Sequence, residues 1–368
     1  MSLEKLRDKF YGCIAGTHIG SAMGAQVECW SYEAIKEKYG VVDKFYSYEH
    51  YDNGWLREPG TTEDGVERQK LIITAIMEKG DRVKAEDIRK IWIRDIKPGA
   101  AGTISEPFEG VLLAMAKTGI PANDLGKYCD YAGLVSFGRS CHPVGLINAG
   151  DPDTAMRDVY ENGQLYQTAN SRGLMWACVT AISIAEACKP NATVDSVIGA
   201  VFDRCDKHWV LPELERELKR TQNVKDFDEL RKMWDPVYCN IGIPYWVSYA
   251  NEIITKGFCI FNLVKGNLED AIIWSVNMGR DTDCAGAIAG GIAGALSGGA
   301  TLRQDWVDQL ELATTLNVNT NSQRTMREHS DGLYNAFISR MKKDLLFADG
   351  MIKGELPNNY KPNLKQVH

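Results

Sequence analysis

Residues 279–296 constrain the fold more than any other segment, because they consist almost wholly of Ala, Gly, Ile and Leu behind two aspartates. Glycines recur every four positions there, at Gly286, Gly290 and Gly294. Each glycine costs a helix roughly 1 kcal/mol in propensity, but a face of small residues lets a neighbouring backbone approach closely. We therefore expect a central, tightly packed helix.

The two carboxylates at the start of this helix are Asp281 and Asp283. Either one can be the N-cap, since a side-chain oxygen of Asp accepts hydrogen bonds from the first free N–H groups. The second aspartate is redundant for capping and is well placed to hold a hard cation. We expect the adjacent Cys284 to be a packed residue of the first turn rather than a nucleophile.

Helical periodicity covers most of the chain, and strand-like alternation is almost absent. Helices are expected at residues 3–24, 32–40, 85–95, 172–188, 194–201, 247–265, 268–277, 303–312 and 330–347, with a charged amphipathic stretch at 211–231. Residues 41–60 read as a long loop. We predict an all-α protein, a compact single-domain helix bundle over residues 1–347 followed by a loosely ordered tail at 348–368.

Composition excludes several classes of protein. The 368 residues are 44% hydrophobic and can bury a large core, and the net charge is 42 − 49 = −7 with both signs interspersed. Without a basic block, nucleic acid is not expected as the main partner. Ten scattered cysteines without a CxxC pair suit a reducing cytoplasm. We expect neither a signal peptide nor a membrane-spanning segment, and the oligomeric state is left open.

A second acidic turn, Thr62-Glu63-Asp64, precedes an apolar helical pattern. Capping by Thr61 or Thr62, with acids that complement the helix dipole, is a sufficient explanation for this turn alone. A third segment, residues 16–28, is rich in small residues and ends on Glu28.

Taken together, the three motifs resemble those of the ADP-ribosylglycohydrolase family. They are Gly-x-Ala-x-Gly-Ala-x-x-Glu ending at Glu28, Thr-acid-Asp at 62–64, and Gly-x-Asp-Thr-Asp-x-x-x-x-x-Ala-Gly from Gly279. The resemblance covers roughly residues 8–300. It implies an orthogonal all-α bundle and a hydrolase that cleaves an N- or O-glycosidic bond at ribose C1′ with one or two Mg²⁺ ions.

The resemblance also implies which residues form the site. The implied metal ligands are Thr62, Glu63, Asp64, Asp281, Asp283 and the position of Cys284, and the implied catalytic residues are Glu28, Glu63, Asp64 and Asp283. Five clustered carboxyl groups would raise one another's pKa unless cations neutralise them. A metal-bound water loses a proton more readily, and a nearby carboxylate can accept it.

Two positions depart from the family pattern. Glu63 stands where the family usually has Asp, so its carboxylate must pivot or coordinate differently. Cys284 stands where a Thr hydroxyl is usual, and a thiol is a poor partner for Mg²⁺. We therefore expect one metal site to be intact and the second to be weakened, retuned or lost.

The substrate is expected to be a small ribosyl or nucleoside-like compound rather than an ADP-ribosylated protein, because the family's Ser-Tyr-Gly-Asn-Gly run is missing. Arg139 or Arg157 could meet a single phosphate and Asn148 a ribose hydroxyl, while Asp151 and Asp153 would repel phosphates unless they face a hydroxyl or a cation. The candidate substrate-binding residues are Gly102, Arg139, Asn148, Asp151, Asp153 and Arg157.

Two alternatives stay open. The carboxylates could serve a lyase or isomerase on the same scaffold, or the chain could be a non-catalytic binding or structural relative. His18 and His142 are expected to be structural, since the sequence has no paired-His metal spacing.

Overall fold

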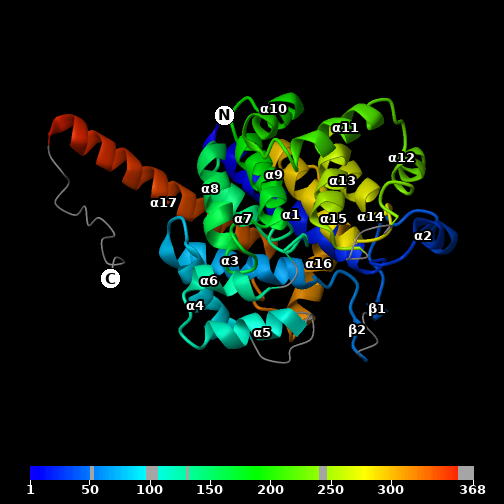
Figure 1. Ribbon diagram of the computed structural model, residues 1–368, viewed down its shortest axis with the longest axis horizontal. Coiled ribbons are helices and arrows are strands. Elements are labelled where there is room, and N and C mark those ends of the chain that lie inside the picture. The colour runs from blue at the N-terminus through cyan, green and yellow to red at the C-terminus, as the bar shows by residue number, and fades with distance from the viewer. Residues whose placement is uncertain (50–53, 97–106, 130–131, 240–246, 355–368) are drawn as a thin grey trace.

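The computed structural model describes residues 1–49, 54–96, 107–129, 132–239 and 247–354, and these ranges contain seventeen α-helices (Figure 1). The all-α prediction is confirmed. The helices are α1 Leu3–Ala25, α2 Tyr32–Tyr39, α3 Asp64–Lys79, α4 Ala85–Asp95, α5 Pro107–Ala116, α6 Ala122–Leu125, α7 His142–Ile147, α8 Pro152–Gly163, α9 Arg172–Ala187, α10 Val194–Arg204, α11 Leu211–Thr221, α12 Phe227–Trp234, α13 Ala250–Leu263, α14 Leu268–Val276, α15 Thr282–Ser297, α16 Gln304–Leu316 and α17 Met326–Lys353.

Helices α1 and α15 form the centre of the bundle. Glycines of one helix meet those of the other, and a Cβ built on Gly16 would lie 2.2 Å from the Gly290 carbonyl oxygen. Gly20 meets Gly286 in the same way, so the two helices run antiparallel. The expectation of a tightly packed helix at 279–296 is confirmed, and the end of α1 comes to lie beside the start of α15.

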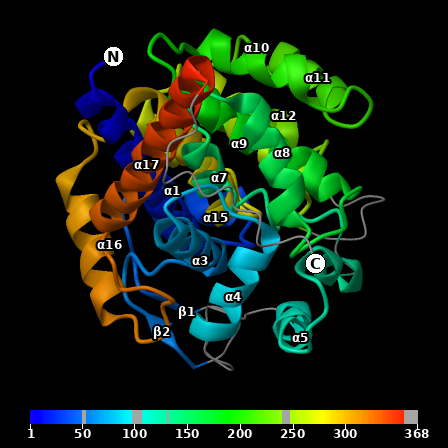
Figure 2. The same ribbon diagram turned by 90° about the vertical axis from the view of Figure 1, so that its left-hand side faces the viewer.

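The other helices surround this pair. Helices α13 and α14 pack against α15, α9 packs against α13 and α15, and α17 packs against α1 and α3 (Figures 1 and 2). The charged stretch at 211–231 forms two helices rather than one, because Asp226 caps a new helix through its side chain. No helix among the described residues is long and apolar enough to span a bilayer.

The loop at 41–60 contains a small antiparallel ribbon, β1 Tyr48–Glu49 and β2 Leu56–Arg57. Tyr48 pairs with Arg57 across it. Both side chains are buried, and this ribbon brings them towards the start of α3.

Helix α17 has 28 residues and begins with a capping box of Thr325 and Glu328. Its first half packs against α1, α3 and α7, and its second half projects from the body of the molecule (Figure 1). The helix continues to Lys353, past the boundary at residue 347 that the sequence suggested. The division into a domain and a tail stays a prediction, and residues 355–368 lie outside the described part of the chain.

Candidate functional site

Two turns hold the ends of α1 and α15 together. The Cys29 N–H donates to the Arg280 carbonyl at 2.8 Å, and the Arg280 N–H donates to the Trp30 carbonyl at 2.8 Å. Cys29 and Arg280 both have positive φ, at 66° and 69°, a conformation that is uncommon for residues other than glycine. This reciprocal contact places Glu28 beside Asp281.

The second acidic motif carries carboxylate oxygens without partners. Of the two aspartates that could cap α15, Asp281 is the N-cap. Its Oδ1 accepts a hydrogen bond from the Cys284 N–H at 3.3 Å. Its Oδ2 and the Oδ1 of Asp283 have no hydrogen-bond partner among the described residues, and both side chains are nearly fully buried. One ligand atom from each of Asp281, Asp283 and Cys284 lies within 4.8 Å of the others.

Such buried oxygens are costly unless a proton or a cation neutralises them, and the raised pKa values of Asp281 and Asp283 show how poorly the protein alone supports their charge. The donor set is two carboxylates and one thiol. Carboxylate oxygens are the ligands that Mg²⁺ and Mn²⁺ prefer, whereas the sulfur favours softer metals. The residues at the start of α15 therefore fit one divalent cation, with Cys284 as the weak member of the set.

The first acidic motif is not a threonine cap. The N-cap of α3 is Glu63, whose side chain makes no capping bond, and Thr61 donates to the Glu58 carbonyl instead. The Thr62 hydroxyl donates to Glu67 Oε1 at 3.0 Å and accepts from Lys70 Nζ at 3.2 Å. Capping by Thr61 or Thr62 therefore does not explain this turn.

Glu63 is neutralised by the β-ribbon. Its Oε1 lies 2.7 Å from Arg57 Nε and accepts from the Tyr48 hydroxyl at 2.5 Å. The Arg57 guanidinium lies over the Trp55 ring, 4.4 Å from its centroid. Arg57 therefore supplies a buried counter-charge to Glu63, since its side chain is only 1% exposed.

Asp64 lies between two arginines. Its Oδ2 accepts from Arg68 at 2.9 Å and from Arg139 at 2.6 Å. The other terminal nitrogen of Arg139 lies 3.4 Å from Cys284 Sγ. Arg139 therefore connects the first acidic motif to the second.

The electrostatics of the two motifs are opposite. Burial raises the pKa of Asp64, but Arg139 and Arg68 outweigh it and lower the pKa to about 2. Burial and the neighbouring Asp281 raise the pKa of Asp283 well above its usual range. Burial and the charge of Asp283 do the same for Glu28. Arginines stabilise the anionic form of Asp64 in the first motif, whereas the charge of Arg139 does not outweigh burial and the repulsion of neighbouring carboxylates at Asp281 and Asp283 in the second.

The surroundings of Cys284 are those of a packed residue. Its side chain is buried, and burial with the neighbouring charges of Asp281 and Asp283 raises the pKa of the thiol well above its usual value. A reactive cysteine needs a lowered pKa. The expectation that this residue packs in the first turn of the helix agrees with this environment.

The remaining predicted site residues lie apart from the cluster. Asn148 is buried and donates to Asp158 at 2.7 Å, and Asp151 caps α8. Asp153 pairs with Arg204 on the surface, and Arg157 donates to the Asp153 carbonyl. The structure therefore engages these four in local contacts and does not bring them to the acidic motifs. Gly102 lies outside the described residues.

Three side chains at the site were missed by the sequence reasoning. Arg68 could have been found, because it follows Asp64 by four positions on one helix and such pairs face each other. Tyr48 and Arg57 carried no signal, since they come from a loop whose folding brings them to Glu63.

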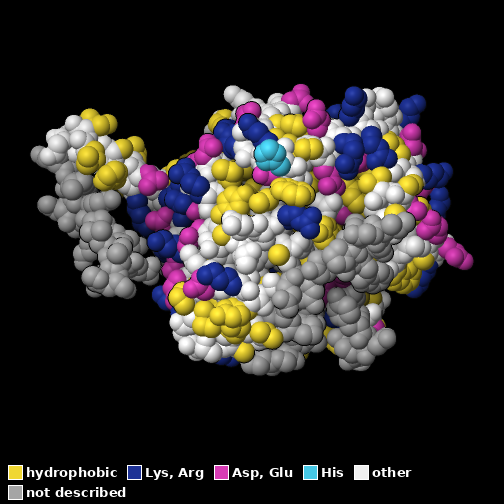
Figure 3. Space-filling model, viewed as in Figure 1, with side chains coloured by type: hydrophobic (Ala, Val, Ile, Leu, Met, Phe, Trp, Pro, Cys, Tyr) yellow, Lys and Arg dark blue, Asp and Glu magenta, His cyan; other side chains and the backbone are white. Residues whose placement is uncertain are grey.

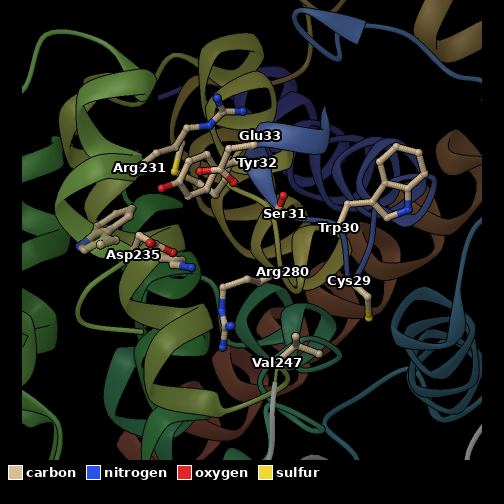
Figure 4. Close-up of a pocket in the computed structure, with 12 residues that line it drawn as sticks. Cys29, Trp30, Ser31, Tyr32, Glu33, Arg231, Asp235, Val247 and Arg280 are labelled. Carbon is tan, nitrogen blue, oxygen red and sulfur yellow. The ribbon is translucent and has the colours of Figure 1, made fainter. Parts of the chain in front are cut away.

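A cavity of about 180 Å³ adjoins these turns (Figure 4). Cys29 and Arg280, the residues that flank Glu28 and Asp281, belong to its wall, and Arg280 and Val247 face Tyr32 and Asp235 across it. Its lining combines three aromatic side chains with three cationic ones, namely Trp30, Tyr32, Trp234, Arg231, Lys256 and Arg280.

Fold and sequence together define the class of protein. The model of the ADP-ribosylglycohydrolase family matches residues 2–340. The chain belongs to the ADP-ribosylglycohydrolase family, a family of glycosidic-bond hydrolases.

Individual relatives agree with this assignment. The chain is 23% identical over 320 residues to the ADP-ribosyl-[dinitrogen reductase] glycohydrolase of Rhodospirillum rubrum, covering 85% of this chain and 93% of that protein. It is 25% identical over 334 residues to an uncharacterized protein of Archaeoglobus fulgidus, covering 84% and 96% of the two chains. A solved ADP-ribosylglycohydrolase-related protein complex shares the fold, with a TM-score of 0.64, 19% identity and coverage of 91% and 99%.

Proposed function

We propose that this chain hydrolyses a glycosidic bond at ribose C1′ of a small ribosyl substrate, with one divalent cation held by Asp281 and Asp283. The observation that carries the proposal is the pair of buried, unpartnered oxygens on these two aspartates. A structural helix start needs only one capping carboxylate. The second carboxylate therefore favours a catalytic site over a purely structural role.

One cation is proposed rather than two, because arginines already neutralise the first motif. Both Arg68 and Arg139 use Asp64 Oδ2, and Arg57 uses Glu63. The Thr62 hydroxyl is engaged by Glu67 and Lys70. These side chains have their own counter-charges, so of the two metal sites that the resemblance implies, the one at Thr62, Glu63 and Asp64 is the one proposed to be lost.

The cation, when bound, would orient ribose hydroxyls and lower the pKa of a water molecule. Glu28 is the acidic side chain of the cluster that keeps some exposure to solvent, and burial and the charge of Asp283 raise its pKa, as a carboxyl group that exchanges a proton with water requires.

The adjoining cavity supports a small substrate. Its volume of about 180 Å³ is below the roughly 300–1,000 Å³ that drug-sized ligands occupy. A single base or sugar would fit, and aromatic rings such as Trp30 and Trp234 offer stacking surfaces.

The test is turnover of a substrate panel with Mg²⁺ or Mn²⁺. The panel contains nucleosides, O-acetyl-ADP-ribose, ADP-ribosyl-serine and ADP-ribosyl-arginine, with release of the free ribosyl product as the readout. Glu28→Gln and Asp283→Asn should each lower kcat at least a hundredfold, and Glu215→Gln, at an exposed position of α11 outside the cavity lining, should leave it unchanged. Cation binding without turnover would favour a lyase, an isomerase or a binding protein, and no cation binding would reject the proposal.

A further inference from the structure

The projecting half of α17 exposes apolar side chains, and those at positions 345, 348 and 352 form a row along one face of the helix. Leu345 is 70% exposed, Leu346 59%, Met351 59% and Ile352 86%. Single exposed apolar residues are ordinary, but a contiguous row on one segment marks an interaction surface. Figure 3 shows hydrophobic side chains gathered on the projection that Figure 1 labels α17, away from the body of the molecule.

The row continues a pattern that is buried closer to the body. Tyr334, Ile338 and Met341 pack against the core, and the same spacing of four and three residues continues at Leu345, Ala348 and Ile352. Alternating steps of three and four give the a and d positions of a heptad repeat. The helix therefore keeps its packing face after its intramolecular partners end.

The projecting half also lies outside the family domain. The family model ends at residue 340, and residues 341–353 add about 20 Å of helix beyond it at 1.5 Å per residue. These residues are not needed to complete the bundle, so their apolar face requires a separate explanation.

We propose that this segment, residues 341–353, pairs with the same segment of a second copy of the chain as an antiparallel two-helix coil. In this register Met341 lies opposite the partner's Ile352, and Leu345 lies opposite the partner's Ala348. A two-fold axis between the helices makes each contact occur twice. The proposal is independent of the proposed enzymatic activity.

The charges beside the row select the antiparallel orientation. With Leu345 and Ile352 at a positions, Lys342 and Asp349 occupy e positions and Asp344 a g position. Equivalent e positions face each other in an antiparallel pair, so Lys342 would face the partner's Asp349. A parallel pair would instead set Asp344 against the partner's Asp349, and like charges there oppose association.

Sedimentation equilibrium of the full-length chain across micromolar concentrations tests the proposal. The wild type should be a dimer, and Leu345→Glu should weaken the dimer at least a hundredfold. Val318→Glu is the matched control, since Val318 is 75% exposed but lies after α16 on the body, and it should leave the dimer intact. A wild type that stays monomeric would overturn the proposal. The same holds if Leu345→Glu only lowers the stability of that monomer, because the row would then pack against its own chain.

A charge exchange tests the orientation. Lys342→Asp and Asp349→Lys should each weaken the dimer about tenfold, and the double variant should restore it. The control is Lys353→Asp, on the same helix end and paired only with Asp349 within the helix, which should change the dimer less than Lys342→Asp does. A dimer that survives Leu345→Glu, or a double variant weaker than both singles, would contradict this interface.

Discussion

Gly12 and Gly294 face each other so closely that a Cβ on Gly294 would lie 1.9 Å from the Gly12 carbonyl oxygen. This contact is one of a series along α1 and α15. It makes the position of Glu28 relative to Asp281 and Asp283 a direct consequence of helix packing, because those residues stand at the adjoining ends of the two helices.

Gly294→Ala should destabilise the protein by about 3 kcal/mol or more, since the new methyl group would press on backbone that cannot move aside. Chemical denaturation of the variant and wild type measures the difference. Gly199→Ala is the control, because Gly199 lies in α10 with no atom within 4 Å of its added Cβ. It should be neutral or stabilising by up to about 1 kcal/mol. Equal effects of the two substitutions would contradict the close packing.

Arg139→Gln should destabilise the protein by about 2–4 kcal/mol at pH 7, because it removes one of the two arginines that pair with the buried Asp64 and leaves only Arg68. The pKa of Asp64 is lowered to about 2 in the folded protein. Its contribution to stability is therefore present above its unfolded pKa of about 4 and is lost as the pH falls towards 2.

Unfolding by urea between pH 7 and pH 2.5 measures this loss. The variant should lose less stability on acidification than the wild type does. Arg204→Gln removes an arginine from the surface pair with Asp153 and should cost no more than about 1 kcal/mol. An unchanged acid slope in Arg139→Gln would show that Arg139 does not hold Asp64 ionised.

Cys284→Thr should strengthen Mg²⁺ binding roughly tenfold, because an oxygen ligand replaces sulfur beside Asp281 and Asp283. Calorimetric titration of Mg²⁺ into the wild type and the variant gives the comparison. Cys178→Ser, a buried helical cysteine that donates to the Leu174 carbonyl, serves as the control and should leave Mg²⁺ affinity unchanged. Unchanged Mg²⁺ affinity in Cys284→Thr would remove the side chain at position 284 from the proposed ligand set, and weaker Mg²⁺ binding would contradict the prediction that the thiol is the weak ligand.

Three buried histidines should make the protein sensitive to mild acid. Burial lowers the pKa of His142 to about 4, and burial lowers the pKa of His18 and His329 well below the usual value. The unfolded chain takes up protons below about pH 6.5 that the folded chain cannot. The free energy of unfolding therefore decreases as the pH is lowered. Each histidine contributes up to about 1.4 kcal/mol per pH unit.

The free energy of unfolding at pH 7, 6 and 5 measures this slope. His329→Gln should reduce the slope by about one histidine's share, whereas exposed His208→Gln should not change it. A slope that is unaffected by His329→Gln would mean that this histidine titrates normally. The contacts of His142 with the Ala287 carbonyl and Gln69 agree with the structural role expected for it.

The sequence by itself determined the all-α fold and most of its helices, because helical periodicity and glycine spacing are local properties of the chain. It also indicated the two acidic motifs, whose residues are adjacent in sequence. The resemblance placed Glu28 with them, and the packing of α1 on α15 is the physical reason that these residues meet.

Only the tertiary structure decided how the charges of the site are compensated. Arg57 and Tyr48 reach Glu63 from a ribbon, and Arg139 reaches Asp64 from a segment 75 residues away. Asn148 and Asp153, expected at the substrate, pair with Asp158 and Arg204 instead. Such pairings depend on which surfaces long-range packing brings together, and no period or spacing along the chain encodes them.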